Sequence, residues 1–253
     1  MEKKAIVGAH AFSCLNDINK IVFLDNAKNA RNKSIYHLGN VESVVAWNDK
    51  NNDKILYVAP TIGNKIYIGE YATYLFYHCT DLKEIVGIDI LDTSISTNMT
   101  AMFCGCKSLA SLDLSSFDTR NIVSMRAMFS GCHNLSNLDV SSFDTSKVTD
   151  MSYMFAWCDL RKLNLSGFNT HNVTNMAHMF YWCDKLISLD LSSFDTSNVK
   201  NMDSMFFCCK NLKSLDLSRF DMSSIQCTNE MFYGCKKNYL PYRLCNNKDI
   251  DSY

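Results

Sequence analysis

Cysteine offers the most chemistry in this sequence, and seven of its twelve cysteines recur in one register. Each of these seven lies three residues after a repeated phenylalanine: Cys79, Cys106, Cys132, Cys158, Cys183, Cys209 and Cys235. Disulfides need side chains that face each other, and zinc needs four converging ligands. Equivalent residues of stacked repeats would instead point the same way. We therefore expect a structural file of buried, reduced thiols that pack as small apolar groups.

Carboxylates recur in two further registers and could bind calcium, which prefers oxygen ligands. One register holds Asp113, Asp139, Asn164, Asp190 and Asp216, and the other holds Asp118, Asp144, Asn169, Asp195 and Asp221. For the second register, hydrogen bonds from nearby backbone N–H groups are the better explanation, because short carboxylate side chains favour such local turns. We therefore assign no metal-binding residue, although calcium remains an alternative.

Sequence motifs for catalysis are missing. The chain has no Gly-x-Ser-x-Gly, no phosphate-binding glycine loop and no His-Glu-x-x-His. None of the six histidines recurs at one repeat position: His10, His37, His78, His133, His171 and His178. We predict that the protein is not an enzyme, with no catalytic residue and no cofactor.

Aromatic residues cluster just before the repeated cysteine in the later units, and one helical turn earlier. The partner-binding candidates are Tyr153, Trp157, His178, Tyr181, Trp182, Phe207 and Tyr233. Other units carry small residues there, such as Ser130-Gly131. Contiguous exposed aromatic groups are typical of interaction surfaces. Packing as the rim of the core is the alternative, and a rival surface is an open sheet face with Arg161, Lys162 and Lys213.

A Met-Phe pair that recurs along the chain reveals the elements that must position these residues. The steps between copies are 26, 26, 25, 26 and 26 residues, with a degenerate earlier copy at Leu75-Phe76. The copies are Met102-Phe103, Met128-Phe129, Met154-Phe155, Met179-Phe180, Met205-Phe206 and Met231-Phe232. Such a period is typical of architectures in which one supersecondary unit stacks on the next.

Each unit mixes two hydrophobic periods. Leu138 and Val140 alternate with Asp139, as in a half-buried strand. Met151, Met154, Phe155 and Cys158 have the spacing of one helix face, with Thr149 as N-cap. The predicted fold class is an α/β repeat: a leucine-rich-repeat-like solenoid with one short parallel strand and one short helix per 26-residue coil. Its predicted parts are a small mixed N-terminal cap over 1–70, six to seven coils over 71–235, and a C-terminal tail or cap over 236–253.

The pattern Leu-Asp-Leu-Ser-Ser-Phe-Asp-Thr, continued by Val, Met, Met-Phe and Cys at fixed spacing, carries a family resemblance. Over about residues 75–235 the chain resembles the BspA-like leucine-rich repeat surface proteins, also described as the mycoplasma-type lipoprotein or 26-residue surface repeat family. Residues 44–76 resemble the module that often precedes these repeats. The resemblance implies a bacterial or protist surface protein that acts in adhesion, without enzymatic activity or cofactor.

Composition limits the classes of partner that we expect the protein to bind. The formal net charge of −1 gives no basic excess for nucleic acid, and no apolar run is long enough to span a membrane. We therefore expect a monomeric, non-catalytic, protein-binding repeat module at the cell surface or secreted, adhesin-like and with a protein ligand. The residues around Cys14 give no convincing export signal, so an intracellular scaffolding or structural repeat protein in the cytoplasm is the alternative.

Overall fold

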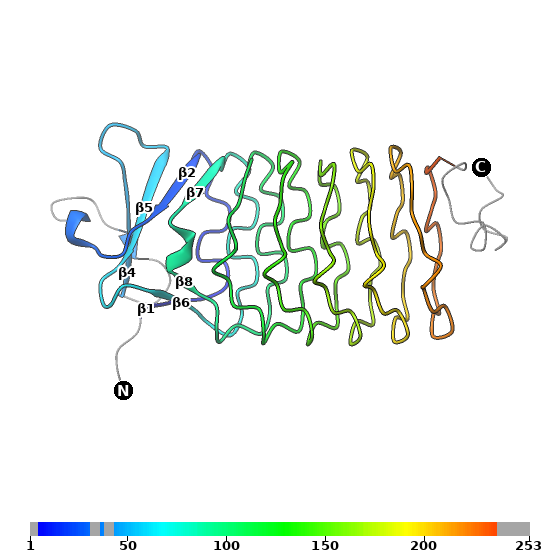
Figure 1. The fold of residues 1–253 in the computed structure, drawn as a ribbon. Coiled ribbons are helices and arrows are strands. Elements are labelled where there is room, and N and C mark those ends of the chain that lie inside the picture. The colour runs from blue at the N-terminus through cyan, green and yellow to red at the C-terminus, as the bar shows by residue number, and fades with distance from the viewer. Residues whose placement is uncertain (1–4, 31–35, 38–42, 237–253) are drawn as a thin grey trace.

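The computed structural model describes residues 5–30, 36–37 and 43–236. Most strands gather at the N-terminal end, and the chain beyond them continues as successive units that lie side by side (Figure 1). Apart from Lys236, the predicted C-terminal tail or cap lies outside the described residues.

The regular secondary structure of the described chain is short. The strands are β1 (Ala5–Val7), β2 (Lys20–Phe23), β3 (Tyr36–His37), β4 (Val44–Asn48), β5 (Ile55–Pro60), β6 (Ile66–Ile68), β7 (Glu84–Val86) and β8 (Leu91–Asp92). Two 3₁₀ turns accompany them, η1 (Lys28–Ala30) and η2 (Ile88–Ile90). All of these elements therefore precede residue 93.

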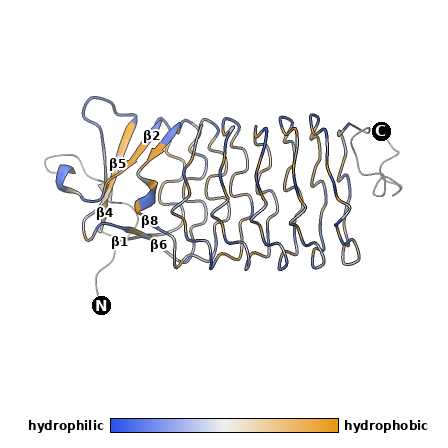
Figure 2. Cartoon of the chain, in the orientation of Figure 1, coloured by the Kyte–Doolittle hydropathy of each residue, from blue (hydrophilic) through white to orange (hydrophobic). Residues whose placement is uncertain are grey.

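These strands form two sheets. The first has the order β1-β6-β8 and is parallel throughout. The second has the order β3-β4-β5-β2-β7, in which β2 runs parallel to both β5 and β7, and the β4–β5 pair is antiparallel. Strand β5 is strongly apolar (Figure 2), so it carries its share of the core at this end of the molecule.

A copy of the repeat precedes the first one found in the sequence. Phe12 stacks on Phe76, with ring centroids 5.2 Å apart, and the Phe12 N–H donates to the Leu75 carbonyl. Sixty-four residues separate the two phenylalanines, because β3, β4 and β5 are inserted between the copies. The sheet β1-β6-β8 accordingly joins equivalent positions of three successive units.

The predicted helix in each unit is wrong. The described chain contains no α-helix, and two residues of the stretch, Tyr153 and Trp157, have φ of 60° and 56°, which an α-helix cannot include. The N–H groups of Met151, Tyr153, Phe155 and Trp157 donate to carbonyls of the next unit. Between them, the N–H groups of Met154 and Ala156 donate three residues back, as in tight turns, and that of Ser152 donates to the Asp150 carboxylate. Thr149 is not an N-cap either, since its hydroxyl donates to Val123 in the preceding unit.

The predicted strand in each repeat unit is also wrong. Leu138 and Val140 are buried on either side of exposed Asp139, but residues 138–140 form no strand. Parallel pairing between later units is reduced to isolated bridges, chiefly in one column: Asn98, Ser124, Asp150, Asn175, Asn201 and Cys227. The leucine-rich-repeat-like solenoid of strand-and-helix coils is therefore corrected to units of successive turns, which hydrogen-bond to their neighbours.

The core of the stacked units centres on a file of phenylalanines. From Phe12 to Phe232, successive rings lie nearly parallel, with centroids between 5.1 and 5.9 Å apart. Methionines, leucines and the repeated cysteines surround this file in one continuous hydrophobic cluster. Full burial of each ring contributes about 1.5–3 kcal/mol, so the file is a main source of stability. The residues that the sequence assigned to a helix face are thus correctly buried, though by a different backbone.

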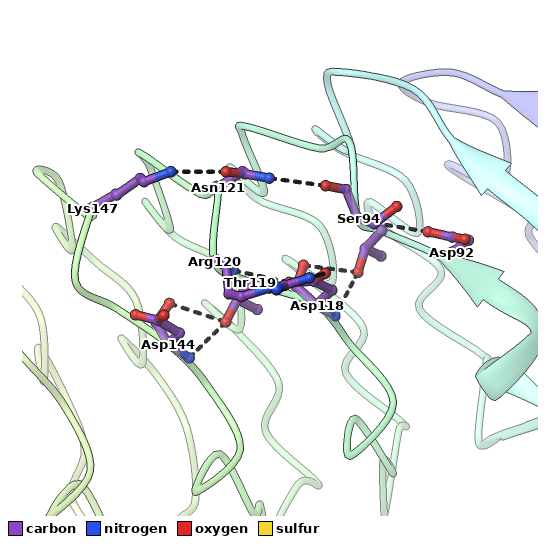
Figure 3. Close-up of polar contacts among 9 residues, drawn as sticks. Asp92, Ser94, Asp118, Thr119, Arg120, Asn121, Asp144 and Lys147 are labelled. Carbon is purple, nitrogen blue, oxygen red and sulfur yellow. Dashed lines mark hydrogen bonds and ion pairs between the residues drawn. The ribbon is translucent and has the colours of Figure 1, made fainter.

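Buried threonines form a ladder of hydrogen bonds between successive units, and Figure 3 shows the bonds around Thr119. The Thr119 hydroxyl donates to the Asp144 carbonyl at 3.0 Å and accepts from the Asp144 N–H at 2.8 Å. Thr93 binds Asp118 in the same way. The same pair of bonds recurs at Thr145, Thr170 and Thr196. Each hydroxyl therefore satisfies one donor and one acceptor of the following unit.

Candidate binding surface

Each described unit has two residues in the left-handed backbone conformation, four positions apart. These residues form one corner of the stacked units. Their φ values lie between 52° and 76°. The pairs are His10/Cys14, Tyr74/His78, Ala101/Gly105, Ala127/Gly131, Tyr153/Trp157, His178/Trp182, Ser204/Cys208 and Glu230/Gly234. A left-handed residue other than glycine costs roughly 1–2 kcal/mol, which the hydrogen bonds between units must offset. Because the positions recur, their side chains form columns.

The seven predicted partner-binding residues lie on this corner, and we call them the aromatic strip. His178 links Tyr153 to Tyr181, with ring centroids 4.3 and 5.2 Å away. Tyr181, Phe207 and Tyr233 then stack in succession at 4.8 Å. Trp157 meets Tyr181 edge-on at 5.0 Å. Six of the seven strip residues are therefore joined by ring contacts across four units, whereas Trp182 contacts the Lys210 ammonium.

Exposure divides the aromatic strip. Trp157, Trp182 and Tyr233 are 38–40 % exposed, whereas the other four rings are half-buried between neighbours. Lys210 holds its ammonium 4.8 Å from the Trp182 ring centroid, and Arg126 approaches Tyr153 at 5.6 Å. The half-buried rings contact two of the exposed rings, Trp157 and Tyr233. The exposed surface thus combines large aromatic faces with positive charge.

His178 is the titratable group inside the aromatic strip. Its Nδ1 atom is buried without a hydrogen-bond partner. Burial lowers the pKa of the His178 imidazole, and nearby Asp203 opposes this shift in part. The ring is therefore held in its neutral form over a wider pH range, which favours stacking with Tyr153 and Tyr181.

A hollow interrupts the corner before the aromatic strip begins. Two successive units carry only small residues at the strip-forming positions: Ala101, Cys104 and Gly105, then Ala127, Ser130 and Gly131. A pocket of about 290 Å³ lies there, between His78 on one side and Trp157 on the other. Lys107 and His133 also line it. The small residues Ser130-Gly131 are visible in the sequence, but their spacing does not predict a pocket.

The repeats match a known protein family. A family model described as "Mycoplasma protein of unknown function, DUF285" matches residues 71–165 and 158–250 in two tandem copies. The chain belongs to the DUF285 family. The prediction of a mycoplasma-type repeat is thereby confirmed at family level. Searches of curated proteins and of solved structures gave no match.

The repeated cysteines of this DUF285 chain lie beside the phenylalanine file. Six are buried, and Cys235 in the last described unit is half-buried; all seven are free thiols. Each Sγ donates to the carbonyl of the phenylalanine one unit back. Burial raises the pKa of the Cys183 thiol to about 12 and moves that of Cys158 in the same direction. The Cys158 and Cys183 thiols therefore act as neutral hydrogen-bond donors.

The aspartates of the DUF285 repeats stabilise turns. Asp139 accepts from the Ser141 N–H at 2.9 Å, Asp144 accepts likewise from Ser146, and Asn164 fills the same role for Ser166. Serine hydrogen bonds lower the pKa of the Asp139 and Asp144 carboxyls. Across the described residues, no group of three or more His, Cys, Asp or Glu side chains could hold a metal ion.

The sheet that was expected to carry the rival basic surface is not found in the described repeats. Arg161, Lys162 and Lys213 are exposed, but no strand lies at any of them, so the open sheet face does not exist there.

Within the described part of this DUF285 chain, no helix has the length and apolarity to cross a membrane.

Proposed function

We propose that this chain is a non-catalytic protein-binding repeat module, and that its aromatic strip contacts the partner. The observation that carries this proposal is the continuous set of ring contacts from Tyr153 to Tyr233, which includes exposed Trp157. Exposed Trp182 directly follows Tyr181 in the chain and lies 4.8 Å from the Lys210 ammonium. Pre-positioned aromatic groups lose little conformational entropy on binding, and such residues dominate the energetics of protein interfaces.

An adhesin-like role at the cell surface or in secreted form is the specific function we propose. The resemblance of the repeat to BspA-like surface proteins supports it, and membership of a mycoplasma-type family is compatible with it. The turn architecture also supports a display role, because each added unit extends the same corner by one more set of side chains.

Capture of partners from host and microbial lysates tests the proposed function. Wild type and the variants Trp157→Ala and Trp182→Ala are immobilised, with a chelator present. We expect one identified protein to bind wild type and to bind each variant at least about tenfold more weakly. Arg161→Ala, on the rival surface, serves as the matched control. Undiminished binding by the double tryptophan variant, with an unchanged circular dichroism spectrum, would overturn the proposal.

An intracellular scaffold is the second candidate, favoured by the file of thiols that must stay protonated to donate their hydrogen bonds. Cell fractionation distinguishes the two candidates. Recovery at the surface or in the medium supports the adhesin-like role, and recovery only in the cytosol supports the scaffold.

A further inference from the structure

The pocket between His78 and Trp157 lies over two units that carry glycine, Gly105 and Gly131, where later units carry tryptophan. A Cβ atom placed on Gly105 would lie 2.6 Å from Cδ2 of His78, so the His78 ring leans over Gly105. A Cβ atom placed on Gly131 would meet only the Gly105 backbone, at 3.6 Å, and the space above it is open. The empty volume therefore lies over Gly131, with the His78 ring on one side and Trp157 on the other.

The spacing of the units suits an aromatic occupant. Equivalent rings of neighbouring units in the phenylalanine file lie 5.1–5.9 Å apart, and rings within the aromatic strip stack at 4.8 Å. A planar group over Gly131 would lie between the rings of His78 and Trp157, the residues that line the pocket on either side. Such stacking contributes about 0.5–1.5 kcal/mol beyond the burial of area.

The charged residues at the rim of the pocket indicate which groups should flank the bound ring. Lys107 and His133 occupy equivalent positions in successive units, two residues after the glycines. Lys210, at the same position in a later unit, places its ammonium over Trp182 in the preceding unit. None of the described residues that line the pocket is acidic. The pocket thus complements negative charge beside an apolar ring.

We propose that this pocket binds an aromatic side chain of a partner protein, flanked in that partner by carboxylates. The inference rests on the proposed protein-binding function and names the chemistry of its partner. The aromatic strip then supplies the flanking contact surface, and the pocket supplies the anchor, as a single buried ring does in many interfaces.

Short peptides test the pocket directly. The probes are acetyl-Glu-Glu-Phe-Glu-Glu-amide, the same peptide with alanine in place of phenylalanine, and the same peptide with glutamine in place of glutamate. We expect the first to shift the backbone amide resonances of Gly105 and Gly131 and to bind at least about tenfold more tightly than either control. Equal binding of the alanine peptide would overturn the proposal. So would saturation of the same resonances by methyl glucuronide, an acidic sugar, without binding of the peptide.

Two variants check that the binding occurs in this pocket. Gly131→Trp fills the pocket from within, and its backbone is suitable because Trp157 and Trp182 occupy the same left-handed position. Lys107→Glu reverses the charge at the rim, and Lys213→Glu, at an exposed lysine that lines neither the pocket nor the aromatic strip, is its control. We expect the first two variants to lose binding by about tenfold or more and Lys213→Glu to retain it. Unchanged peptide binding by Lys107→Glu would overturn the proposal even if Gly131→Trp did not fold.

The same variants separate this inference from the proposed function. Trp182 does not line the pocket. A captured partner that is lost with Trp182→Ala but retained by Gly131→Trp would sink the pocket proposal and leave the aromatic strip intact. A partner retained by both would count against both.

Discussion

The Sγ atom of Cys158 lies 3.0 Å from the carbonyl oxygen of Phe129, one unit back. The same contact recurs along the cysteine file at 2.9–3.2 Å. A thiol can donate this bond only while it keeps its proton. Oxidation or ionisation would therefore remove this bond and leave the Phe129 carbonyl with one donor, the Cys132 N–H at 3.1 Å. A hydrogen bond of this kind contributes about 0.5–1.5 kcal/mol.

Alkylation should distinguish the file from the exposed thiols. Since burial raises the pKa of Cys183 to about 12, its reactive thiolate is scarce near pH 8, and the side chain is also inaccessible. We expect iodoacetamide to modify exposed Cys14 in the native protein and Cys183 only after denaturant is added. Peptide mapping by mass spectrometry measures both sites in one sample. Modification of native Cys183 as fast as Cys14 would contradict this account.

The threonine ladder can be tested at Thr145, which is 1 % exposed. Its hydroxyl donates to the Asn169 carbonyl at 2.9 Å and accepts from the Asn169 N–H at 2.8 Å. Thr145→Val keeps the shape but strands both groups, so we expect a loss of roughly 1–3 kcal/mol for each of them in the free energy of unfolding. Urea denaturation measures the change. Thr145→Ser should retain most of the stability. Half-buried Thr149→Val, which loses one bond to the Val123 carbonyl at 3.2 Å, should have a smaller effect.

Acid should destabilise the repeats through their aspartates. Hydrogen bonds from Ser197 and His171 lower the pKa of the Asp195 carboxyl to about 2, from an ordinary value of 3.8. A lowered folded-state pKa contributes stability above the unfolded value, and that stability is lost as the pH falls from about 4 towards 2. We expect the melting temperature to fall over that range, with a shallower slope for Asp195→Asn. Asp53→Asn, in the β4–β5 turn, controls for the loss of one negative charge, and an identical slope for wild type and Asp195→Asn would refute the assignment.

Much of the core could be predicted from the sequence because burial depends on side-chain period alone. Met151, Met154, Phe155 and Cys158 are all buried, as the spacing indicates. The backbone could not be predicted from that spacing, because tight turns with a left-handed residue also bring these four side chains to one side. The turn architecture also explains why no strand forms at Leu138: most hydrogen bonds between units lie elsewhere.

The aromatic strip could be predicted from the sequence, whereas the pocket could not. The aromatic strip follows from the positions before the repeated cysteine, and the structure places all seven of its residues on one corner. The pocket is made by side chains that are missing at Gly105 and Gly131, which have no periodic signal of their own. The repeat around Phe12 could not be predicted from the period because Phe12 lies 64 residues before Phe76, far more than one repeat.

Two alanine-to-glycine substitutions test the left-handed backbone that replaces the predicted helix, because they should change the free energy of unfolding differently. Ala127 has a φ of 53°, whereas Ala177, in the corresponding stretch two units later, has no positive φ. Ala127→Gly relieves roughly 1–2 kcal/mol of backbone strain and gives back about 0.4–1 kcal/mol through the freer unfolded chain. We therefore expect Ala127→Gly to leave the free energy of unfolding unchanged or to raise it by about 1 kcal/mol. Ala177→Gly has no strain to relieve and should lower it by about 1 kcal/mol. If a true helix spanned these residues, both substitutions would destabilise by similar amounts, and urea titration of the two variants decides between the backbones.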